Sequence, residues 1–189
     1  IYAMAHKSGR FEPEALGLGA AKADAWRASF RMTALKPIRV VEEAGEHGAT
    51  AKALLLTEDG LSIECVRIPM ATRERDLDRA TLCISSQIGC RMGCAFCETG
   101  RGGLVRSLAA GEIVGQVIAA RHALGWRFKN VVFMGMGEPF DNAPELFRSL
   151  EVLFDQSGLG LAQDRITICS SGHVEGIRLL AERPWRRLN

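Results

Sequence analysis

The chain has 189 residues, of which 47% are hydrophobic and 24% charged, enough for one domain with a sizeable core. No apolar run reaches the roughly 18 residues of a membrane span, and the N-terminus lacks the basic-then-apolar pattern of a secretory signal, so we expect a cytoplasmic protein without membrane contact. The net charge of +2 is too small to indicate nucleic-acid binding by itself. The chain opens on Ile1 and stops without a terminating pattern, so we expect both ends to be cuts in a longer protein.

The N-terminal part predicts a helix followed by a hairpin. In residues 22–35, Ala23, Trp26 and Phe30 recur at helical spacing, and Pro37 ends the pattern. Residues 49–69 form two β-like runs around Asp59-Gly60, a dipeptide that supplies the positive φ of a tight turn.

The second run of this hairpin carries one candidate functional residue. Ile63 and Cys65 share one face with Leu61, and we expect Cys65 in the core. Glu64 lies on the other face, together with Ser62, Val66 and Ile68. A carboxylate beside apolar side chains would be desolvated, whereas one on a solvated edge strand would not, and the sequence leaves both interpretations open.

From Ala80 onward, strands alternate with amphipathic helices. The predicted strands cover 80–86, 130–138 and 165–172, and the predicted helices cover 108–124, 144–154 and 173–182. Apolar stripes mark the first two helices: Ile113, Val117, Ala120 and Leu124, then Leu146, Leu150 and Leu153. The pattern predicts an α/β fold with a parallel sheet over 80–189, preceded by an accessory segment over 1–79 that ends in a charged link, 71–79. The third strand would leave an unpaired edge, so we expect further strands downstream.

Three of the six cysteines follow the spacing C-x3-C-x2-C directly after the first of these strands. Cys90, Cys94 and Cys97 could hold one metal centre in a reducing compartment. Structural zinc needs a fourth ligand nearby, and the next histidine, His122, falls on a predicted helix. Three thiolates instead favour an iron–sulfur cluster with one iron open to another ligand. His47, His122 and His173 are interpreted as solvent or packing residues.

This motif, with Phe96 before the last cysteine, resembles the radical S-adenosylmethionine (SAM) superfamily. The resemblance implies a (βα)6 partial barrel and a [4Fe–4S] cluster whose open iron is chelated by SAM. The stretch "MGMGEP", Met134–Pro139, resembles the Gly-Gly-Glu-Pro strand end of the same superfamily. By that resemblance Gly137 and Glu138 bind SAM, with the Glu138 carboxylate accepting from the SAM ammonium.

A narrower resemblance covers residues from about Leu61 to the end. The segments "CISSQIGCRMGCAFC", "GEIVGQV", "NVVFMGMGEP" and "RITICSSG" are similar to the adenine-C2 methyltransferases of 23S rRNA and certain tRNAs. The chain would then be the first half of the partial barrel. RNA would be its substrate, bound through basic side chains and base flipping, and a protein such as flavodoxin would be its electron donor.

The same resemblance assigns roles to individual residues. Spacing alone favours reading Cys83 as a buried strand cysteine, but by the resemblance it matches the cysteine that attacks the covalent RNA adduct. Its thiolate would be promoted by a cationic SAM nearby. Glu64 matches a proposed proton acceptor. Cys169 stands where the family often has a serine, and with Ser170 and Ser171 it would line SAM.

Two departures from the family pattern keep alternatives open. The family's second catalytic cysteine matches neither Cys65 nor Cys169, so we expect it beyond Asn189. Glu98 replaces a common alanine beside the cluster and would disfavour cluster reduction unless Arg101 neutralises it. The alternatives are a radical-SAM paralog that acts on a peptide or small molecule, and a non-enzymatic iron–sulfur or zinc module.

Overall fold

The computed structural model describes residues 2–30, 32, 35–46, 48–70 and 80–189, so His47 and the predicted link 71–79 lie outside the described residues. The helices of this part are α1 (Tyr2–Ser8), α2 (Ala20–Ser29), α3 (Glu98–Arg101), α4 (Ala110–Ile118), α5 (Ala143–Phe154) and α6 (Val174–Ala181). The strands are β1 (Lys36–Glu43), β2 (Thr50–Leu56), β3 (Ser62–Pro69), β4 (Ala80–Cys83), β5 (Gln87–Gly89), β6 (Leu104–Ser107), β7 (Asn130–Phe133) and β8 (Ile166–Ile168). Short helical turns are η1 (Pro13–Leu16), η3 (Ala119–Ala123), η4 (Pro139–Asn142) and η5 (Gln163–Arg165).

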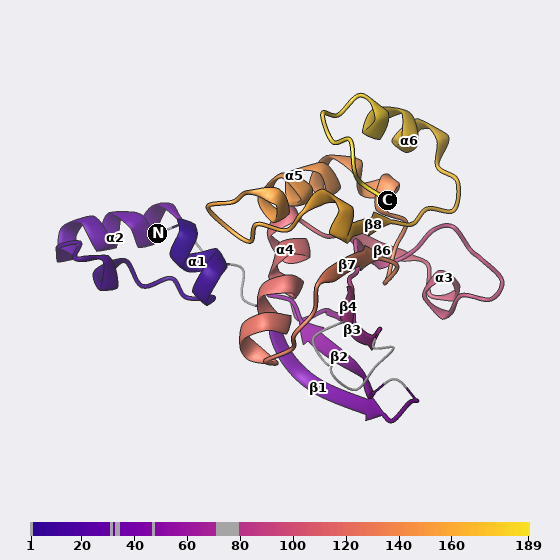
Figure 1. The fold of residues 1–189 in the computed structure, drawn as a ribbon, viewed down its shortest axis with the longest axis horizontal. Coiled ribbons are helices and arrows are strands. Elements are labelled where there is room, and N and C mark those ends of the chain that lie inside the picture. The colour runs from indigo at the N-terminus through magenta and orange to yellow at the C-terminus, as the bar shows by residue number, and fades with distance from the viewer. Residues whose placement is uncertain (1, 31, 33–34, 47, 71–79) are drawn as a thin grey trace.

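Six strands form one sheet in the order β1-β2-β3-β4-β7-β8 (Figure 1). The pairs from β1 to β4 are antiparallel, whereas β4, β7 and β8 run parallel. The predicted hairpin is therefore hydrogen bonded directly to the first strand of the α/β core. A second, two-stranded sheet pairs β5 with β6.

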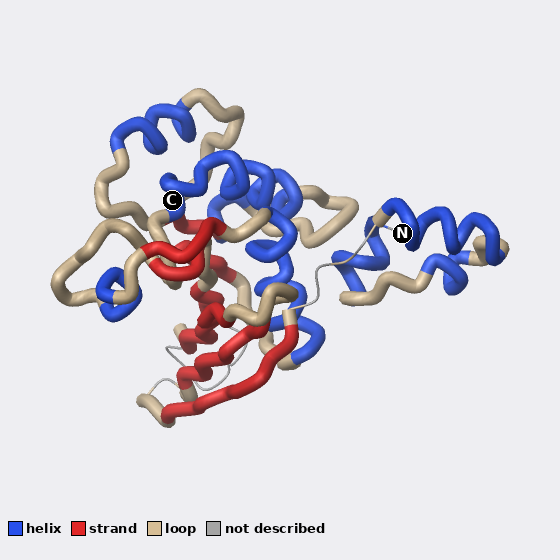
Figure 2. The backbone as a smooth tube through the Cα atoms, turned by 180° about the vertical axis from the view of Figure 1, so that it is seen from behind, coloured by secondary structure: helices blue, strands red, loops and turns tan. Residues whose placement is uncertain are grey.

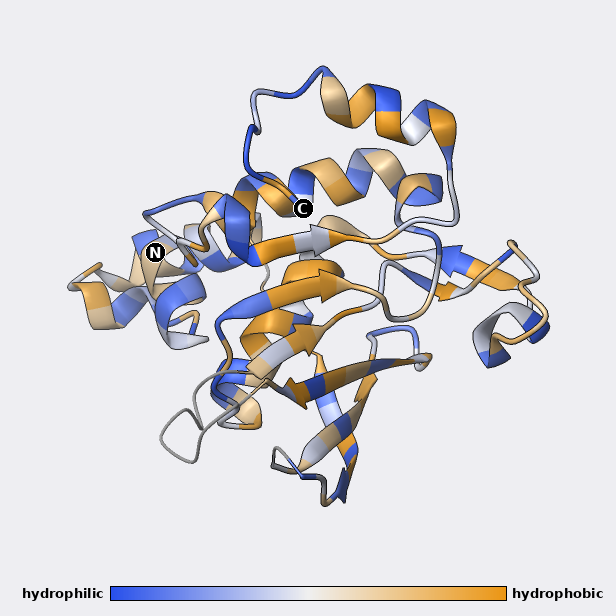
Figure 3. Ribbon diagram, turned by 45° about the vertical axis from the view of Figure 1, so that its right-hand side comes forward, coloured by the Kyte–Doolittle hydropathy of each residue, from blue (hydrophilic) through white to orange (hydrophobic). Residues whose placement is uncertain are grey.

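Helices α4 and α5 cover one face of the large sheet, and this face forms the core (Figure 1). Its strand residues include Leu55, Ile63, Leu82, Val131 and Ile166, each fully buried. The predicted helical stripes point to them: Ile113, Val117, Ala120, Leu146, Leu150 and Leu153 are also fully buried. Burial of each of the larger side chains stabilises the fold by about 1.5–3 kcal/mol. Figure 3 shows the resulting hydrophobic strands and helix faces.

The opposite face of the sheet carries two of the predicted functional side chains, Glu64 and Cys83, and we call it the cysteine face. It is defined by Glu64, Val66, Cys83, Val132 and Thr167. Val66 pairs with Cys83, Cys83 with Val132, and Val132 with Thr167, and directly paired residues point to the same side of a sheet. Alternation along β3 adds Glu64 to this face.

The N-terminal region differs from the prediction in two ways. The helix ends at Ser29 rather than continuing to residue 35, and Lys36–Glu43 forms strand β1, which the sequence analysis did not predict. Pro37 lies on an edge strand and next to an irregularity in the register between Pro37 and Arg39, which are positions where prolines occur in sheets. Helices α1 and α2 lie at one side of the molecule, beyond α4 (Figures 1 and 2). The hairpin of β2 and β3 is confirmed, with Gly60 at φ 81° in its turn.

The last strand is shorter than predicted, and part of its outer edge is paired. β8 ends at Ile168 instead of continuing to residue 172. The Ile168 N–H donates to the Asn189 carbonyl at 2.9 Å, and the Asn189 N–H donates to the Ile166 carbonyl at 3.2 Å. The expectation of an unpaired edge is therefore wrong for these groups. None of the helices in the described ranges has the length and apolar character needed to cross a membrane.

Candidate functional site

The three motif cysteines lie in a loop between β5 and β6, and a glycine contact closes the base of this loop. The Cys90 N–H donates to the Gly103 carbonyl at 2.9 Å. Gly89 has φ 77°, and a Cβ there would lie 2.0 Å from the same oxygen. Cys90 is buried at the base, whereas Cys94 and Cys97 are partly exposed nearer the tip. We call residues 90–103 the cysteine loop.

Replacement of Gly89 by alanine is expected to lower the free energy of unfolding by about 2–4 kcal/mol, because the new methyl group combines positive-φ strain with a backbone clash. Gly93 is a matched control: its φ is 62°, but nothing lies within 4 Å of the added Cβ, so Gly93→Ala retains only the strain. Urea unfolding of both variants measures the difference. An equal decrease in the free energy of unfolding in both variants would show that the contact with Gly103 is unimportant.

The donor chemistry of the cysteine loop fits an iron–sulfur cluster, although the ligands are not assembled around a metal position. All three thiols are free, and soft thiolates suit such clusters. Among the described residues, no three Cys, His, Asp or Glu side chains converge closely enough to hold an ion. Contacts near the tip are local: the Cys97 N–H donates to Cys94, and Arg101 pairs with Glu98 at 3.1 Å. The Glu98 side chain is 88% exposed, so the ion pair with Arg101 lies in solvent, and the effect of this pair on cluster reduction stays a prediction.

The segment after β7 packs tightly on the segment after β4. Gly137 has φ 101°, and a Cβ there would lie 2.6 Å from the Gln87 side chain. The Glu138 N–H donates to Gln87 Oε1 at 2.9 Å. Gly137 is thus needed for close packing within the chain, and its predicted contact with SAM stays a prediction.

The Glu138 carboxylate connects the ends of β7 and β8. Only 3% of Glu138 is exposed. Its Oε2 accepts from the Ser171 N–H at 2.8 Å and from the Ser171 hydroxyl at 2.9 Å, and its Oε1 accepts from the Phe140 N–H at 3.2 Å. Ser171 therefore contacts Glu138 directly. A Glu138 contact with a SAM ammonium would add to three existing hydrogen bonds.

The turn after β8 contains the other predicted SAM ligands. Ser170 Oγ accepts from the N–H groups of Gly172 and His173, both at 3.1 Å, and so shapes the turn into α6. His173 Nδ1 in turn accepts from the Gly176 N–H at 3.0 Å. His173 is thus an N-cap residue, a role that the sequence analysis did not assign. Cys169 is partly exposed beside this turn.

Cys83 lies on the cysteine face at the end of β4 and is 8% exposed. Burial raises the pKa of its thiol, the Met134 backbone opposes this shift, and nearby Cys169 raises the pKa further. The protein alone therefore disfavours the thiolate. The predicted role of Cys83 as a nucleophile would depend on a cation brought by a ligand. Cys65, on the helix-covered face, is fully buried, and burial raises its pKa to about 12.

Glu64 shares the cysteine face, and of the two interpretations left open by the sequence the structure favours the solvated carboxylate over the desolvated one. Its side chain is 44% exposed and pairs with Lys52 Nζ of the neighbouring strand at 2.9 Å. The Glu64 carbonyl accepts from Ser85 Oγ at 2.8 Å, which fixes the backbone of β3 beside the segment that follows β4. The role of Glu64 as a base stays a prediction.

Several buried polar residues that sequence reasoning missed hold this segment in place. Gln116 of α4 accepts from the Ser85 N–H and donates to the Ser85 carbonyl, both at 2.8 Å. Asn142 donates to the carbonyls of Ser86 and Leu108 at 2.9 and 2.7 Å. A glutamine in the apolar stripe of α4 is the sequence signal that could have revealed part of this network, because buried polar groups need partners.

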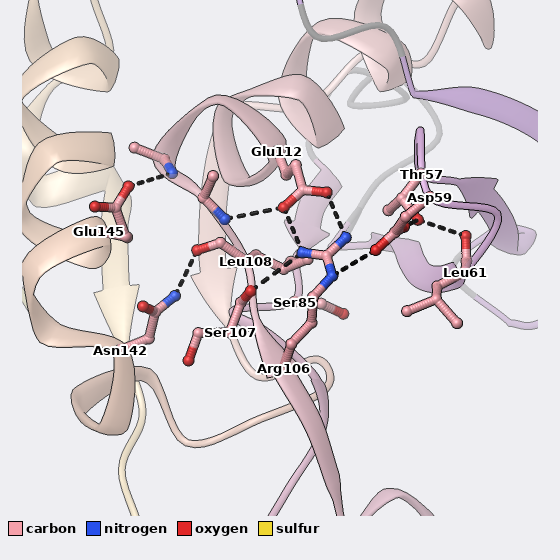
Figure 4. A network of polar contacts seen from close by, with 12 residues as sticks. Thr57, Asp59, Leu61, Ser85, Arg106, Ser107, Leu108, Glu112, Asn142 and Glu145 are labelled. Carbon is pink, nitrogen blue, oxygen red and sulfur yellow. Dashed lines mark hydrogen bonds and ion pairs between the residues drawn. The ribbon is translucent and has the colours of Figure 1, made fainter.

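Arg106 links the hairpin turn to the start of α4 (Figure 4). Its guanidinium donates to both Glu112 oxygens at 2.8 Å and to Asp59 Oδ2 at 2.8 Å. Glu112 also accepts from the Ala109 N–H at 2.9 Å and so caps α4. The β2–β3 turn is thereby attached to β6, the strand that closes the cysteine loop.

This network predicts acid-sensitive stability. Hydrogen bonds from Arg106 and then Thr57 hold the pKa of Asp59 well below its usual range. The folded state thus binds fewer protons than the unfolded state, and the contribution of Asp59 is complete above about pH 4 and is lost as the pH falls below it. Asp59→Asn should lower the Tm at pH 7 and lower it by a smaller amount at pH 3, where the unfolded carboxyl is largely protonated while the folded one is still largely ionised. Asp24→Asn, at a side chain 76% exposed, is the control, and an equal Tm loss at both pH values would contradict this account.

The sequence model of the Radical SAM superfamily matches residues 84–189 of this chain. This range includes the cysteine loop and the segments after β7 and β8. In solved structures, a radical SAM methyltransferase from Sphaerobacter thermophilus superposes with a TM-score of 0.81 at 37% sequence identity. That match covers 98% of this chain and 53% of the other.

Curated relatives share a narrower name. "Probable dual-specificity RNA methyltransferase RlmN 1" of Protochlamydia amoebophila is 52% identical over 136 residues, which are 71% of this chain and 36% of the relative. "Dual-specificity RNA methyltransferase RlmN" of Nitratidesulfovibrio vulgaris strain DP4 is 48% identical over 139 residues, 70% of this chain and 38% of the relative. The chain thus spans well under half the length of these relatives.

Proposed function

This chain belongs to the radical SAM superfamily, and on that premise we propose that it is part of an RNA methyltransferase that modifies C2 of an adenine in 23S rRNA and in certain tRNAs. Its identity of 40–52% to proteins named as RNA methyltransferases is the observation that carries the proposal. The fold supports it, because the cysteine loop and the segments after β7 and β8 adjoin at the carboxyl ends of parallel strands, where α/β folds bind ligands.

The cofactor part of the proposal assigns two sets of residues. Cys90, Cys94 and Cys97 would hold a [4Fe–4S] cluster, and Gly137, Glu138, Cys169 and Ser170 would bind SAM. When bound, this pair supplies a 5′-deoxyadenosyl radical. Glu138 already orders the turn at Ser171, so its carboxylate would both shape the SAM site and meet the ligand's ammonium.

The RNA part of the proposal concerns the cysteine face. Cys83 would resolve the covalent RNA adduct, and Glu64 would accept a proton. Both project from the same face of adjacent strands, which supports a shared substrate position. The other thiol that this route requires matches neither Cys65, buried under the helices, nor Cys169. RNA and an electron donor of the flavodoxin type are the proposed partners.

Anaerobic reconstitution followed by EPR of the reduced protein tests the cofactor assignment. We expect a [4Fe–4S]⁺ signal that changes when SAM is added, because SAM would occupy the open iron. Bound zinc without sulfide would instead favour a structural metal module and contradict the proposal. Loss of the SAM response in Glu138→Gln, but not in Glu151→Gln at an exposed site, would support the assigned SAM position.

The RNA assignment is tested separately by binding. A 23S rRNA fragment that contains the target adenine should bind the reconstituted protein with higher affinity than a scrambled fragment of the same length. Equal affinity for both at matched salt would leave only backbone electrostatics and would contradict substrate recognition by this part of the chain.

A further inference from the structure

One buried carboxylate joins the cysteine loop to the segments after β7 and β8. Asp141 lies on η4, three residues after Glu138, and its side chain is 2% exposed. Arg91 Nε donates to Asp141 Oδ2 at 2.6 Å, and Arg91 Nη2 donates to Oδ1 at 2.7 Å. His173 Nε2 lies 3.4 Å from the same Oδ1. We call these three residues the Asp141 clamp.

Each member of the clamp comes from a different segment. Arg91 directly follows Cys90, Asp141 follows β7, and His173 caps α6 after β8. Because His173 Nδ1 accepts from the Gly176 N–H, its Nε2 carries the proton and faces the carboxylate. A two-point bond between guanidinium and carboxylate is among the strongest and most directional contacts in proteins. The clamp thus fixes both distance and orientation between the loop base and the other two segments.

The rest of the cysteine loop has weaker attachments. The Cys90 N–H bond to Gly103 stays within the loop, as do the contacts of Cys94, Cys97 and Glu98. Among the described contacts, it is therefore the two hydrogen bonds from Arg91 to Asp141 that join a side chain of the loop to the segments after β7 and β8. Residues 92–102 have no comparable bond to those segments among the described contacts.

The geometry points to Asp141 as a positioning residue for the cysteine loop. By holding Arg91, it sets the place of the adjacent Cys90 thiol relative to Glu138 and the turn after β8. This inference rests on the proposed function only in taking Cys90 as a cluster ligand. The clamp itself is a property of the polypeptide and can be measured without iron, SAM or RNA.

Alkylation of the cluster-free protein tests the inference. Cys90 is 8% exposed and should react with iodoacetamide through local opening of the loop base. Asp141→Asn removes the charge that holds Arg91, so we expect Cys90 alkylation to accelerate about tenfold, measured by mass spectrometry of its peptide. Cys65, fully buried under the helices, reports global unfolding in the same sample and should keep its rate. The Arg178→Met control removes an arginine that is 73% exposed on α6 and should change neither rate.

The alkylation rates of Cys90 and Cys65 decide whether Asp141 positions the loop. Faster reaction of Cys90 alone supports this role. Parallel acceleration of Cys65, or no change at Cys90, would overturn it. If Asp141→Asn fails to fold, Arg91→Lys provides the second test, because it alters a side chain that is 62% exposed, keeps the charge and removes the fork. The same selective increase at Cys90 is then expected, and its absence would overturn the inference.

A second readout uses the reconstituted protein. The inference predicts that bound iron is lost to a chelator several-fold faster in Asp141→Asn than in the wild type or Arg178→Met. An unchanged rate of loss would show that the clamp does not position the ligand. If even the wild type takes up no cluster, the proposed function fails, whereas the alkylation result for the clamp stands by itself.

Discussion

Replacement of Cys94 by serine is expected to reduce bound iron and sulfide to no more than about a tenth of the wild-type level after reconstitution, because two thiolates and a hydroxyl are a poor ligand set for the cluster. Cys94 is a better choice than the buried Cys90 because it is partly exposed, so its replacement does not open a cavity in the core. Iron and sulfide analysis with visible absorption measures the effect.

Cys65→Ala is the control for this experiment. Cys65 is fully buried on the opposite face of the sheet and has no proposed contact with the cluster. This variant should be less stable but should bind a full complement of iron. If Cys94→Ser retains wild-type iron and sulfide, the cysteine loop is not the cluster site.

Replacement of Glu138 by glutamine has the second large expected effect, on both stability and SAM binding. The carboxylate accepts from Ser171 at one oxygen and from Phe140 at the other. Glutamine offers one acceptor and one donor group, so either orientation leaves a buried N–H facing another donor. We expect the free energy of unfolding to fall by about 1–3 kcal/mol.

SAM affinity should fall at least about tenfold in the same variant, because a charge-assisted bond to the ligand ammonium is lost. Equilibrium dialysis of the anaerobically reconstituted protein measures this, with Glu151→Gln as an exposed control. If stability falls while SAM affinity is unchanged, Glu138 only connects the ends of β7 and β8 and does not contact the ligand.

The local patterns of this sequence were sufficient for much of the fold. Helices α4 and α5 carry clear 3.6-residue stripes, and Leu146, Leu150 and Leu153 are buried as predicted. The β2–β3 hairpin followed from alternation around Asp59 and Gly60. β1 could not be predicted in the same way, because both of its faces are largely exposed and it therefore lacks alternation.

The candidate site could be predicted only where its signal is local. Cysteine spacing indicated the loop, and the comparisons support the family. The ion pair of Glu64 depends on strand register, which brings Lys52 of β2 beside it. The partners of Asp141 lie 50 residues before it and 32 residues after it in the chain, and charged residues in loops carry no pattern that pairs them. Such contacts follow from topology and not from any local stretch of sequence.

The order of strands in the sheet has a consequence for synthesis on the ribosome. β2 and β3 are neighbours in both sequence and space, so this hairpin can form as soon as it emerges. Its β3 edge then awaits β4, and β4 in turn awaits β7, where Thr81 pairs with Asn130. Each completed strand offers the template for the next, from the N-terminus onward. The nascent chain should therefore expose an unpaired, aggregation-prone edge while residues 84–129 are being translated, which is the interval when a chaperone would be most useful.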